Sequence, residues 1–250
     1  MRENFSSACL KTVHIIVLNY KRVAMDIILA SGSPRRRELL SRAKLDFTIL
    51  SVDIDETPHD NESPKDYIAR MVAAKAEAAI EQLNINLKNN QTDLPESFIV
   101  LTSDTIGVLA DGKTVLVKPI NREHAYSMWQ QMSDNTHEVW TAVQATQISL
   151  LPQLSEKSEL ANTPNYKQAF QVVNQQQIIE RTEVTFIALT KEMMRNYWDS
   201  GEPADKAGGY GIQGLGATWV SRINGSYTNV VGLPLAQTLA LIKDMTDTSI

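Results

Sequence analysis

Short apolar runs recur along the chain and predict strands. The runs at 27–30 and 98–101 are nearly continuous, which is typical of strands covered on both faces. Asp111-Gly112 stands between two short apolar arms and predicts a hairpin turn. The predicted strands are 27–30, 47–54, 98–101, 106–109, 114–117, 139–150, 178–189 and 218–223.

Helical periods alternate with these strands, and most begin at a residue that caps helices. Ser33 and Ser63 are each followed by proline, which suits the first helical position. Asn121 and Thr190 are further capping residues. The predicted helices run from Pro34 past Ala43, from Ser63 to about Leu83, from Asn121 to about Met132, from Thr190 to about Ser200, and from Pro234 to about Met245. Strands alternating with helices predict an α/β fold.

Composition narrows the class of protein. At 250 residues, 43% of them apolar and 21% charged, the chain fits one globular domain or two small ones. A net charge of -5 argues against a general nucleic-acid binder, so any positive region is local. No apolar run reaches the ~20 residues of a membrane span, so we expect no membrane partner. Cys9 is the single cysteine, which suits a cytoplasmic protein without disulfides.

Two segments stand apart from this pattern. Residues 1–24 show no clear period, and Met25 directly precedes the first convincing strand, so we expect a dispensable N-terminal extension or a misassigned start. The polar residues 152–177 form an expanded connection between two predicted strands. Residues 25–250 are then expected to form a single domain.

The first helix carries a basic first turn, Pro34-Arg35-Arg36-Arg37. The helix dipole prefers acids there, so the arginines break a local preference that a bound anion would restore. Gly32 just before the turn lets a ligand approach the backbone closely. The alternative is a solvated basic turn, and the spacing alone leaves both open.

Two further side chains have a structural and a functional interpretation. Asp104 follows the apolar run 98–101 and is expected just past the carboxyl end of a strand, where α/β proteins place their chemistry. A helix cap or turn former is its alternative role. Lys75 falls on the apolar face of the helix 63–83, either as an edge residue reaching solvent or as a cation turned toward a ligand.

Common catalytic motifs are missing or out of context. Five of the 11 glycines lie between positions 208 and 216, and Gly209-x-Gly211-x-x-Gly214 matches a dinucleotide fingerprint. No strand is predicted before it and no helix after it, so we reject that interpretation. What remains is a set of cations and acids near the ends of predicted elements, which indicates a phosphate-handling protein. They are Arg35, Arg36, Lys75, Lys118 and Lys206, with Glu56, Asp104 and Asp205.

The same residues resemble the ordered signatures of the Maf family. Four separated motifs carry the resemblance: Leu29-Ala30-Ser31-Gly32-Ser33-Pro34-Arg35-Arg36, Ser103-Asp104-Thr105, Lys118-Pro119, and Asp205-Lys206-Ala207-Gly208-Gly209-Tyr210-Gly211-Ile212-Gln213-Gly214. Asn224-Gly225-Ser226-Tyr227 and the segment after it extend the match from about Met25 to the last helix. The Tyr210-Gly211-Ile212-Gln213 form looks like the dTTP/UTP pyrophosphatase branch.

This resemblance implies an elongated mixed sheet flanked by helices, with two lobes around a nucleotide cleft, as in Maf/ITPase-like folds. It implies hydrolysis of a nucleoside triphosphate to monophosphate and pyrophosphate with a divalent cation, Mg or Mn. The catalytic acid falls on Asp104, and specificity positions fall on Arg35, Thr105 and Gln213. Further substrate-binding residues are expected at Ser31, Arg36, Lys75 and Lys118, and metal ligands at Glu56 and Asp104.

Other functions stay open beside this one. The family is associated with septum inhibition, so a nucleotide-binding regulator of cell division that acts through a partner is the alternative from another class. A pyrophosphatase for a purine or modified nucleotide is the alternative within the class. Clearance of modified nucleotides and assembly into homodimers are left open.

Overall fold

One long mixed sheet of seven strands organises the part of the chain that the structure describes. The computed structural model describes residues 25–89, 94–151 and 170–247. Strand order is β2-β1-β3-β5-β6-β7, with β4 paired to β3. The strands are β1 (Asp26–Leu29), β2 (Thr48–Ile49), β3 (Ser97–Val108), β4 (Val115–Leu116), β5 (Thr136–Leu150), β6 (Phe170–Phe186) and β7 (Val220–Asn224). The expected α/β fold with a mixed sheet is confirmed.

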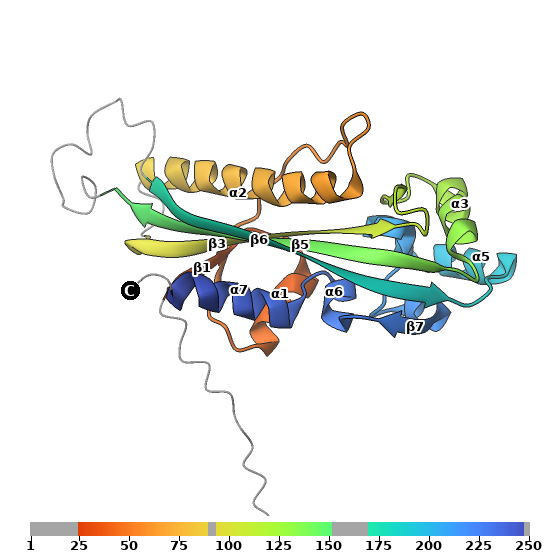
Figure 1. Cartoon of the computed structure of the whole chain (residues 1–250). Coiled ribbons are helices and arrows are strands. Elements are labelled where there is room, and N and C mark those ends of the chain that lie inside the picture. Colours follow the sequence, from red (N-terminus) through yellow and green to blue (C-terminus); the bar gives the residue numbers. More distant parts are fainter. Residues whose placement is uncertain (1–24, 90–93, 152–169, 248–250) are drawn as a thin grey trace, which may run out of the picture.

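Helices cover both faces of this sheet (Figure 1). The long helix α2 lies across one face, and α1, α6 and α7 lie across the other. A second group, α3 and α5, packs at the far end of the sheet. Their bounds are α1 (Pro34–Arg42), α2 (Pro64–Lys88), α3 (Arg122–Met132), α5 (Lys191–Asp199), α6 (Tyr227–Val231) and α7 (Leu235–Asp247).

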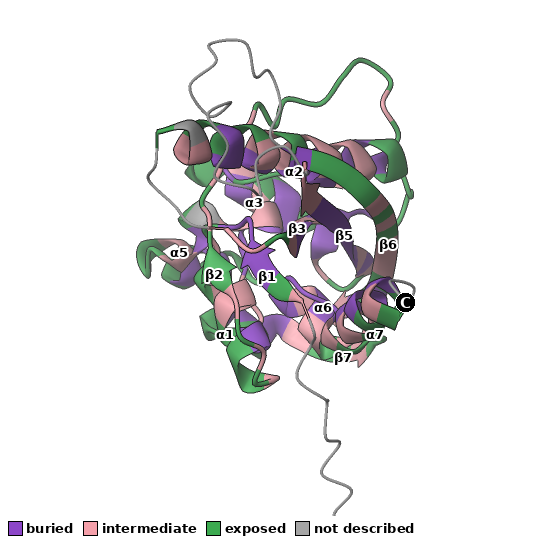
Figure 2. Ribbon diagram, turned by 90° about the vertical axis from the view of Figure 1, so that its left-hand side faces the viewer, coloured by how far each residue is buried: buried purple, intermediate pink, exposed green. Residues whose placement is uncertain are grey.

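Alternation along β3 divides the core between the two faces. Phe98 and Val100 pack beneath α2, whereas Ile99 and Leu101 face α1 and α7, because successive strand residues point to opposite sides. Figure 2 shows the buried strands enclosed between these two helical layers. None of the helices in the described ranges combines the length and apolarity needed to cross a bilayer.

Capping residues begin the helices as predicted, with one exception. The side chains of Ser63, Asn121 and Thr190 each accept a backbone N–H from the first turn of the helix that follows. Ser33 holds the N-cap position of α1, but its side chain accepts no capping bond. Its backbone N–H instead donates to Ser31 Oγ at 3.3 Å.

Several predicted bounds were wrong, and for the strands the reason is that pairing with a neighbour decides where a strand ends. The strand expected at 47–54 is only Thr48–Ile49, since β1 stops at Leu29 and offers no longer partner. The strand expected from 178 begins at Phe170, which is 2% exposed and packs edge-on against Phe98. Helix α2 continues to Lys88, past the predicted end at Leu83.

The two segments set apart in the sequence are only partly described. Residues 1–24 and 152–169 lie outside the described residues, so their expected character stays a prediction. Residues 170–177 of the expected connection belong to β6. The short helix α6 was not predicted, although Ser226 caps it by accepting the backbone N–H of Asn229.

A buried hydroxyl ties β3 to α2 and allows a test of this packing. Thr102 is fully buried, and its Oγ1 donates to the carbonyl of Val72 at 2.8 Å. Thr102→Val keeps the shape of the side chain but leaves the carbonyl of Val72 without this hydrogen bond. The free energy of unfolding, measured in urea, should therefore fall by about 1 kcal/mol. Thr246→Val, which removes an exposed helix-end hydroxyl bond, should change it by less than about 0.5 kcal/mol. Equal effects of the two substitutions would contradict this role of Thr102.

Candidate active site

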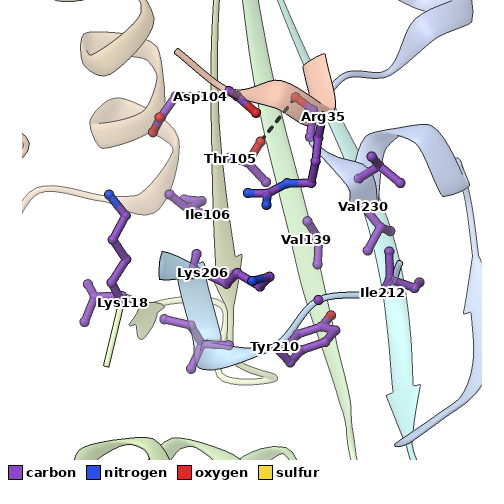
Figure 3. A pocket seen from close by; sticks show the side chains of 18 of the residues that line it. Arg35, Asp104, Thr105, Ile106, Lys118, Val139, Lys206, Tyr210, Ile212 and Val230 are labelled. Atoms are coloured by element: carbon purple, nitrogen blue, oxygen red, sulfur yellow. Dashed lines mark hydrogen bonds between the residues drawn. The ribbon is translucent and has the colours of Figure 1, made fainter. Parts of the chain in front are cut away.

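A cleft opens where β3 lacks a strand partner on one edge. β1 pairs with residues 98–101 of β3, and β4 pairs only with Gly107 and Val108. Among the described strands none covers residues 102–106 on that edge. The cavity there measures about 790 Å³ and is lined by α1, α2, β3, β4 and the glycine-rich loop 202–214 (Figure 3).

Asp104 and Lys75 form a close ion pair at the α2 side of the cleft. Lys75 Nζ lies 2.6 Å from Asp104 Oδ1 and 3.0 Å from Glu56 Oε1. The side chains of Lys75 and Asp104 are 12% and 14% exposed. One ammonium therefore binds two carboxylates. The side chain of Lys75 turns into the cleft and not toward solvent, and its contact with a ligand stays a prediction.

The loop that carries Glu56 is held by α2. Tyr67 Oη donates to the carbonyl of Glu56 at 2.9 Å, and Arg70 Nη2 donates to the carbonyl of Thr57 at 3.1 Å. Burial raises the pKa of Glu56, but the ammonium groups of Lys75 and Lys118 outweigh burial and lower it below its ordinary value. Glu56 is therefore a carboxylate at neutral pH.

The opposite face of β3 presents Thr105 to the half-buried Arg36. Thr105 Oγ1 accepts from Arg36 Nη2 at 3.2 Å and lies 3.0 Å from Thr141 Oγ1. Arg36 also donates to the Gly232 carbonyl at 2.9 Å and to Ser31 Oγ at 3.2 Å. Burial lowers the pKa of Arg36, and the neighbouring Asp104 charge only partly opposes it. An anion in the cleft would compensate this desolvated charge.

Further cations converge on the same cavity from other elements. Figure 3 shows Arg35 reaching in from α1, with Lys118 and Lys206 on other walls. Lys118 Nζ lies 3.4 Å from Glu56 Oε2, and its side chain is 62% exposed. Among the side chains that the structure describes, five basic ones line the cleft against three acidic ones, namely Arg35, Arg36, Lys75, Lys118 and Lys206 against Glu56, Asp104 and Glu202.

The end of the cleft away from Asp104 is mostly apolar. Val139, Val230 and Ile212 line it together with the ring of Tyr210 (Figure 3). Gln213 is exposed on the same wall. A charged end and an apolar end with one amide are what a nucleotide requires, since its phosphates are anionic and its base is flat and polar at the edge.

The carboxylates of the cleft could bind a divalent cation that is also held by the phosphates of a substrate. Asp104 and Glu56 both contact Lys75, so their carboxylates face one region of the cleft. Mg²⁺ is commonly held by one or two carboxylates together with substrate phosphates. No group of three His, Cys, Asp or Glu residues that could hold a metal occurs among the described side chains. The two carboxylates are thus the residues that could share a metal with a bound nucleotide.

The structure brings most of the sequence-predicted site residues into one cavity. They are Arg35, Arg36, Glu56, Lys75, Asp104, Thr105, Lys118 and Gln213. Ser31 is buried behind Arg36 and does not line the cavity. The side chain of Asp205 lies outside the described part of the chain.

The expected position of Asp104 past the end of a strand is wrong. β3 continues to Val108, so Asp104 lies within it, opposite Ala142 of β5. The polar residues that indicated a strand end are satisfied by side-chain bonds, since Thr102 donates to Val72 and Ser103 donates to the Gly232 carbonyl. The carboxylate reaches the cleft because the strand edge beside it is open.

Sequence reasoning missed the apolar residues of this cleft and also three polar ones, Tyr67, Glu202 and Tyr210. Tyr67 precedes Lys75 by eight residues on α2, a spacing that places both on one helix face, and could have been found from it. Tyr210 lies inside the glycine-rich motif and Glu202 precedes it by three residues, and the motif gave no role for either. Tyr210 Oη lies 2.8 Å from Nε2 of the buried His137, on a strand far away in sequence.

Comparison with known proteins identifies a family. The family described as Maf-like protein matches residues 26–245. A dTTP/UTP pyrophosphatase of Psychrobacter cryohalolentis is 75% identical over 90% of this chain and 99% of its own length. Proteins of the same name from Psychrobacter arcticus and Vibrio vulnificus are 73% and 41% identical, over 90% and 87% of this chain and 97% of each relative.

The buried His137 beneath the cleft predicts a pH dependence of stability. Burial lowers the pKa of His137 to about 4 from its ordinary 6.5. The unfolded chain therefore binds a proton that the folded chain does not, and the unfolding free energy falls as pH drops from about 6.5 toward 4. Above pH 6.5 the histidine is neutral in both states and costs no stability. Below that pH the unfolding free energy falls with a slope that approaches ~1.4 kcal/mol per pH unit.

His137→Gln should remove this slope in urea unfolding measured between pH 4 and 7. His59→Gln is the matched control, because His59 is exposed, and it should keep the wild-type slope. An unchanged slope in the His137 variant would contradict the assignment.

Proposed function

The chain belongs to the Maf family, and we propose that it hydrolyses dTTP and UTP to the nucleoside monophosphate and pyrophosphate. Supporting this, relatives up to 75% identical are named dTTP/UTP pyrophosphatases. The single observation that carries the proposal is the Asp104–Lys75–Glu56 cluster at the open edge of β3, inside a cleft where cations outnumber acids.

The phosphates are met by cations from three elements. Arg35 and Arg36 come from α1, Lys75 from α2, and Lys118 follows β4. Each guanidinium nitrogen of Arg36 donates one hydrogen bond, to Gly232, Ser31 and Thr105 in turn. Because the guanidinium carries five N–H groups, two of them can still donate to a phosphate oxygen. Its direction is fixed before substrate arrives, which reduces the reorganisation that binding requires.

Asp104 is the proposed general base. Lys75 contacts Oδ1, and the second carboxylate oxygen can accept a proton from a water that attacks the α-phosphorus. Lys75 holds the carboxylate in place through the 2.6 Å contact with Oδ1. Pyrophosphate leaves with its negative charge opposed by the surrounding cations.

Asp104 and Glu56 are also the residues that would hold a divalent cation, Mg²⁺ or Mn²⁺. When bound, such a cation neutralises charge on the phosphate oxygens. Glu56 is suited to this because its backbone is anchored by Tyr67 and its carboxyl group is ionised.

Base selection is assigned to the other end of the cleft. Gln213 carries the amide at that end, and a glutamine amide offers a donor and an acceptor. Thr105, the other expected specificity residue, lies beside Arg36 between the two ends. The amide of Gln213 matches the N3–H donor and O4 acceptor of thymine and uracil. A site with such groups disfavours a base that leaves them unpaired.

A nucleotide panel tests the proposed function. The wild-type protein with MgCl₂ or MnCl₂ should release pyrophosphate from dTTP and UTP, with kcat/KM at least tenfold above that for dCTP and ATP. Omission of the metal should abolish release. A protein that binds dTTP but releases no pyrophosphate with either metal would contradict the proposal and favour the regulator.

Asp104→Asn tests the mechanism. Asparagine keeps the shape but cannot accept the proton, so kcat for dTTP should fall by roughly 10²–10⁴-fold. KM should change less than about tenfold, because the cations that meet the phosphates remain.

Asp199→Asn breaks an exposed ion pair with Arg122 and should keep wild-type turnover. Unimpaired turnover in folded Asp104→Asn would place the base elsewhere, with Glu56 as the next candidate.

A further inference from the structure

The loop that carries Gln213 contains little regular structure. Between α5 and β7 the chain forms three short 3₁₀ helices, at Glu202–Asp205, Ala207–Gly209 and Leu215–Trp219. Gln213 lies between the last two and is exposed, so packing of its own side chain does not fix its position. Something else must hold the backbone from which it extends.

The carboxylate of Glu202 supplies that anchor. Its Oε2 accepts the backbone N–H of Leu215 at 2.8 Å, and its Oε1 lies 3.4 Å from the N of Gly216 and accepts the Tyr197 hydroxyl at 2.7 Å. Hydrogen bonds to a charged acceptor are roughly twice as strong as neutral ones. Burial raises the pKa of Glu202, but these donors outweigh burial and lower it, so the anchor is ionised at neutral pH.

Further contacts close a ring on the other side of Gln213. Tyr197 Oη, while donating to Glu202, accepts the backbone N–H of Gly211 at 3.0 Å. Lys206 Nζ donates to the carbonyl of Glu202 at 2.6 Å. Both flanks of Gln213, at positions 211 and 215–216, are therefore tied to one carboxylate.

Gly214 shows how closely the loop follows this anchor. A Cβ at position 214 would collide with the carboxylate of Glu202. The φ angle of Gly214 is -117°, so the glycine is required by this close approach and not by a left-handed backbone. The residue directly after Gln213 thus lies against Glu202.

We propose that Glu202, oriented by Tyr197, is a positioning residue that sets base selectivity by holding Gln213 in the cleft. This inference rests on the proposed function. Glu202 lines the same cavity as Asp104, but its oxygens are taken by three donors of the protein, whereas Asp104 and Glu56 are gathered on Lys75. Its role is therefore in the geometry of the base end and not in proton transfer.

Glu202→Gln tests the inference because it keeps the side chain's size and replaces one acceptor oxygen with a donor. The ratio of kcat/KM for dTTP over dCTP should fall about tenfold, mainly through a higher KM for dTTP. Amide hydrogen exchange at Leu215 and Gly216 should become faster in the same variant. A uniform loss of activity on dTTP, UTP, dCTP and ATP would overturn the inference.

Coupling to Gln213 separates positioning from general damage. Gln213→Ala alone should lower the same ratio, and adding Glu202→Gln should lower it no further, because the anchor then has nothing to hold. Additive losses would overturn the inference.

Asp111→Asn is the matched control. Its carboxylate also accepts two backbone N–H groups and one hydroxyl, in the β3–β4 hairpin. It should keep the wild-type ranking of bases.

Two outcomes distinguish this inference from the proposed function. A wild-type protein that releases no pyrophosphate overturns both. A wild-type protein with the expected ranking, lost in Gln213→Ala but kept in Glu202→Gln, overturns this inference alone. Should Glu202→Gln fail to fold, Tyr197→Phe removes only the bridging hydroxyl and should still lower the dTTP/dCTP ratio; an unchanged ratio would overturn the inference.

Discussion

The open edge of β3 is the constraint on which the site depends. β1 ends at Leu29 and β4 pairs only from Gly107, so β3 crosses a gap in the sheet with its other edge secured by β5 over the whole length. Residues of a strand alternate between faces, so Asp104 meets Lys75 of α2 while Thr105 meets Arg36 of α1. At a fully paired position these two side chains would be separated by the sheet. At the gap they line one cleft.

Lys75 can stand half-buried in the wall of the cleft only because acids meet it there. An isolated ammonium in a low-dielectric environment is strongly unfavourable, and a single close carboxylate restores only part of the lost hydration. Asp104 at 2.6 Å and Glu56 at 3.0 Å give it two partners, while Glu56 retains exposure on its outer side. The half-buried pair Lys75–Asp104 stands on a helix and a strand. Glu56, on a loop held by Tyr67, is the member that can adjust to a ligand.

The sequence predicted the elements better than their ends. The helices were predicted correctly from the helical repeat of apolar residues and from the capping residues, because both signals are local in sequence. The end of β3 was misplaced because Thr102 and Ser103 are polar but find partners on Val72 and Gly232, which no local pattern shows. The site residues were found through their charge and through motif resemblance. Glu202 was not given a role, since its function lies in contacts to a loop that follows it in the chain, at Leu215 and Gly216.

Features that are locally unfavourable converge on the same cleft. The first turn of α1 carries arginines and no acid, Lys75 stands on an apolar helix face, and Gly214 presses against a carboxylate. Each of these charged groups has a partner from a different element. Arg36 donates to Thr105 of β3 and to Gly232, and Lys75 donates to Asp104. The carboxylate of Glu202 accepts the hydroxyl of Tyr197 of α5. Because these partners are distant in sequence, the charges are fixed only once the sheet and helices have packed. The cleft therefore has its cations and carboxylates oriented before a nucleotide enters, and binding energy is not spent on arranging them.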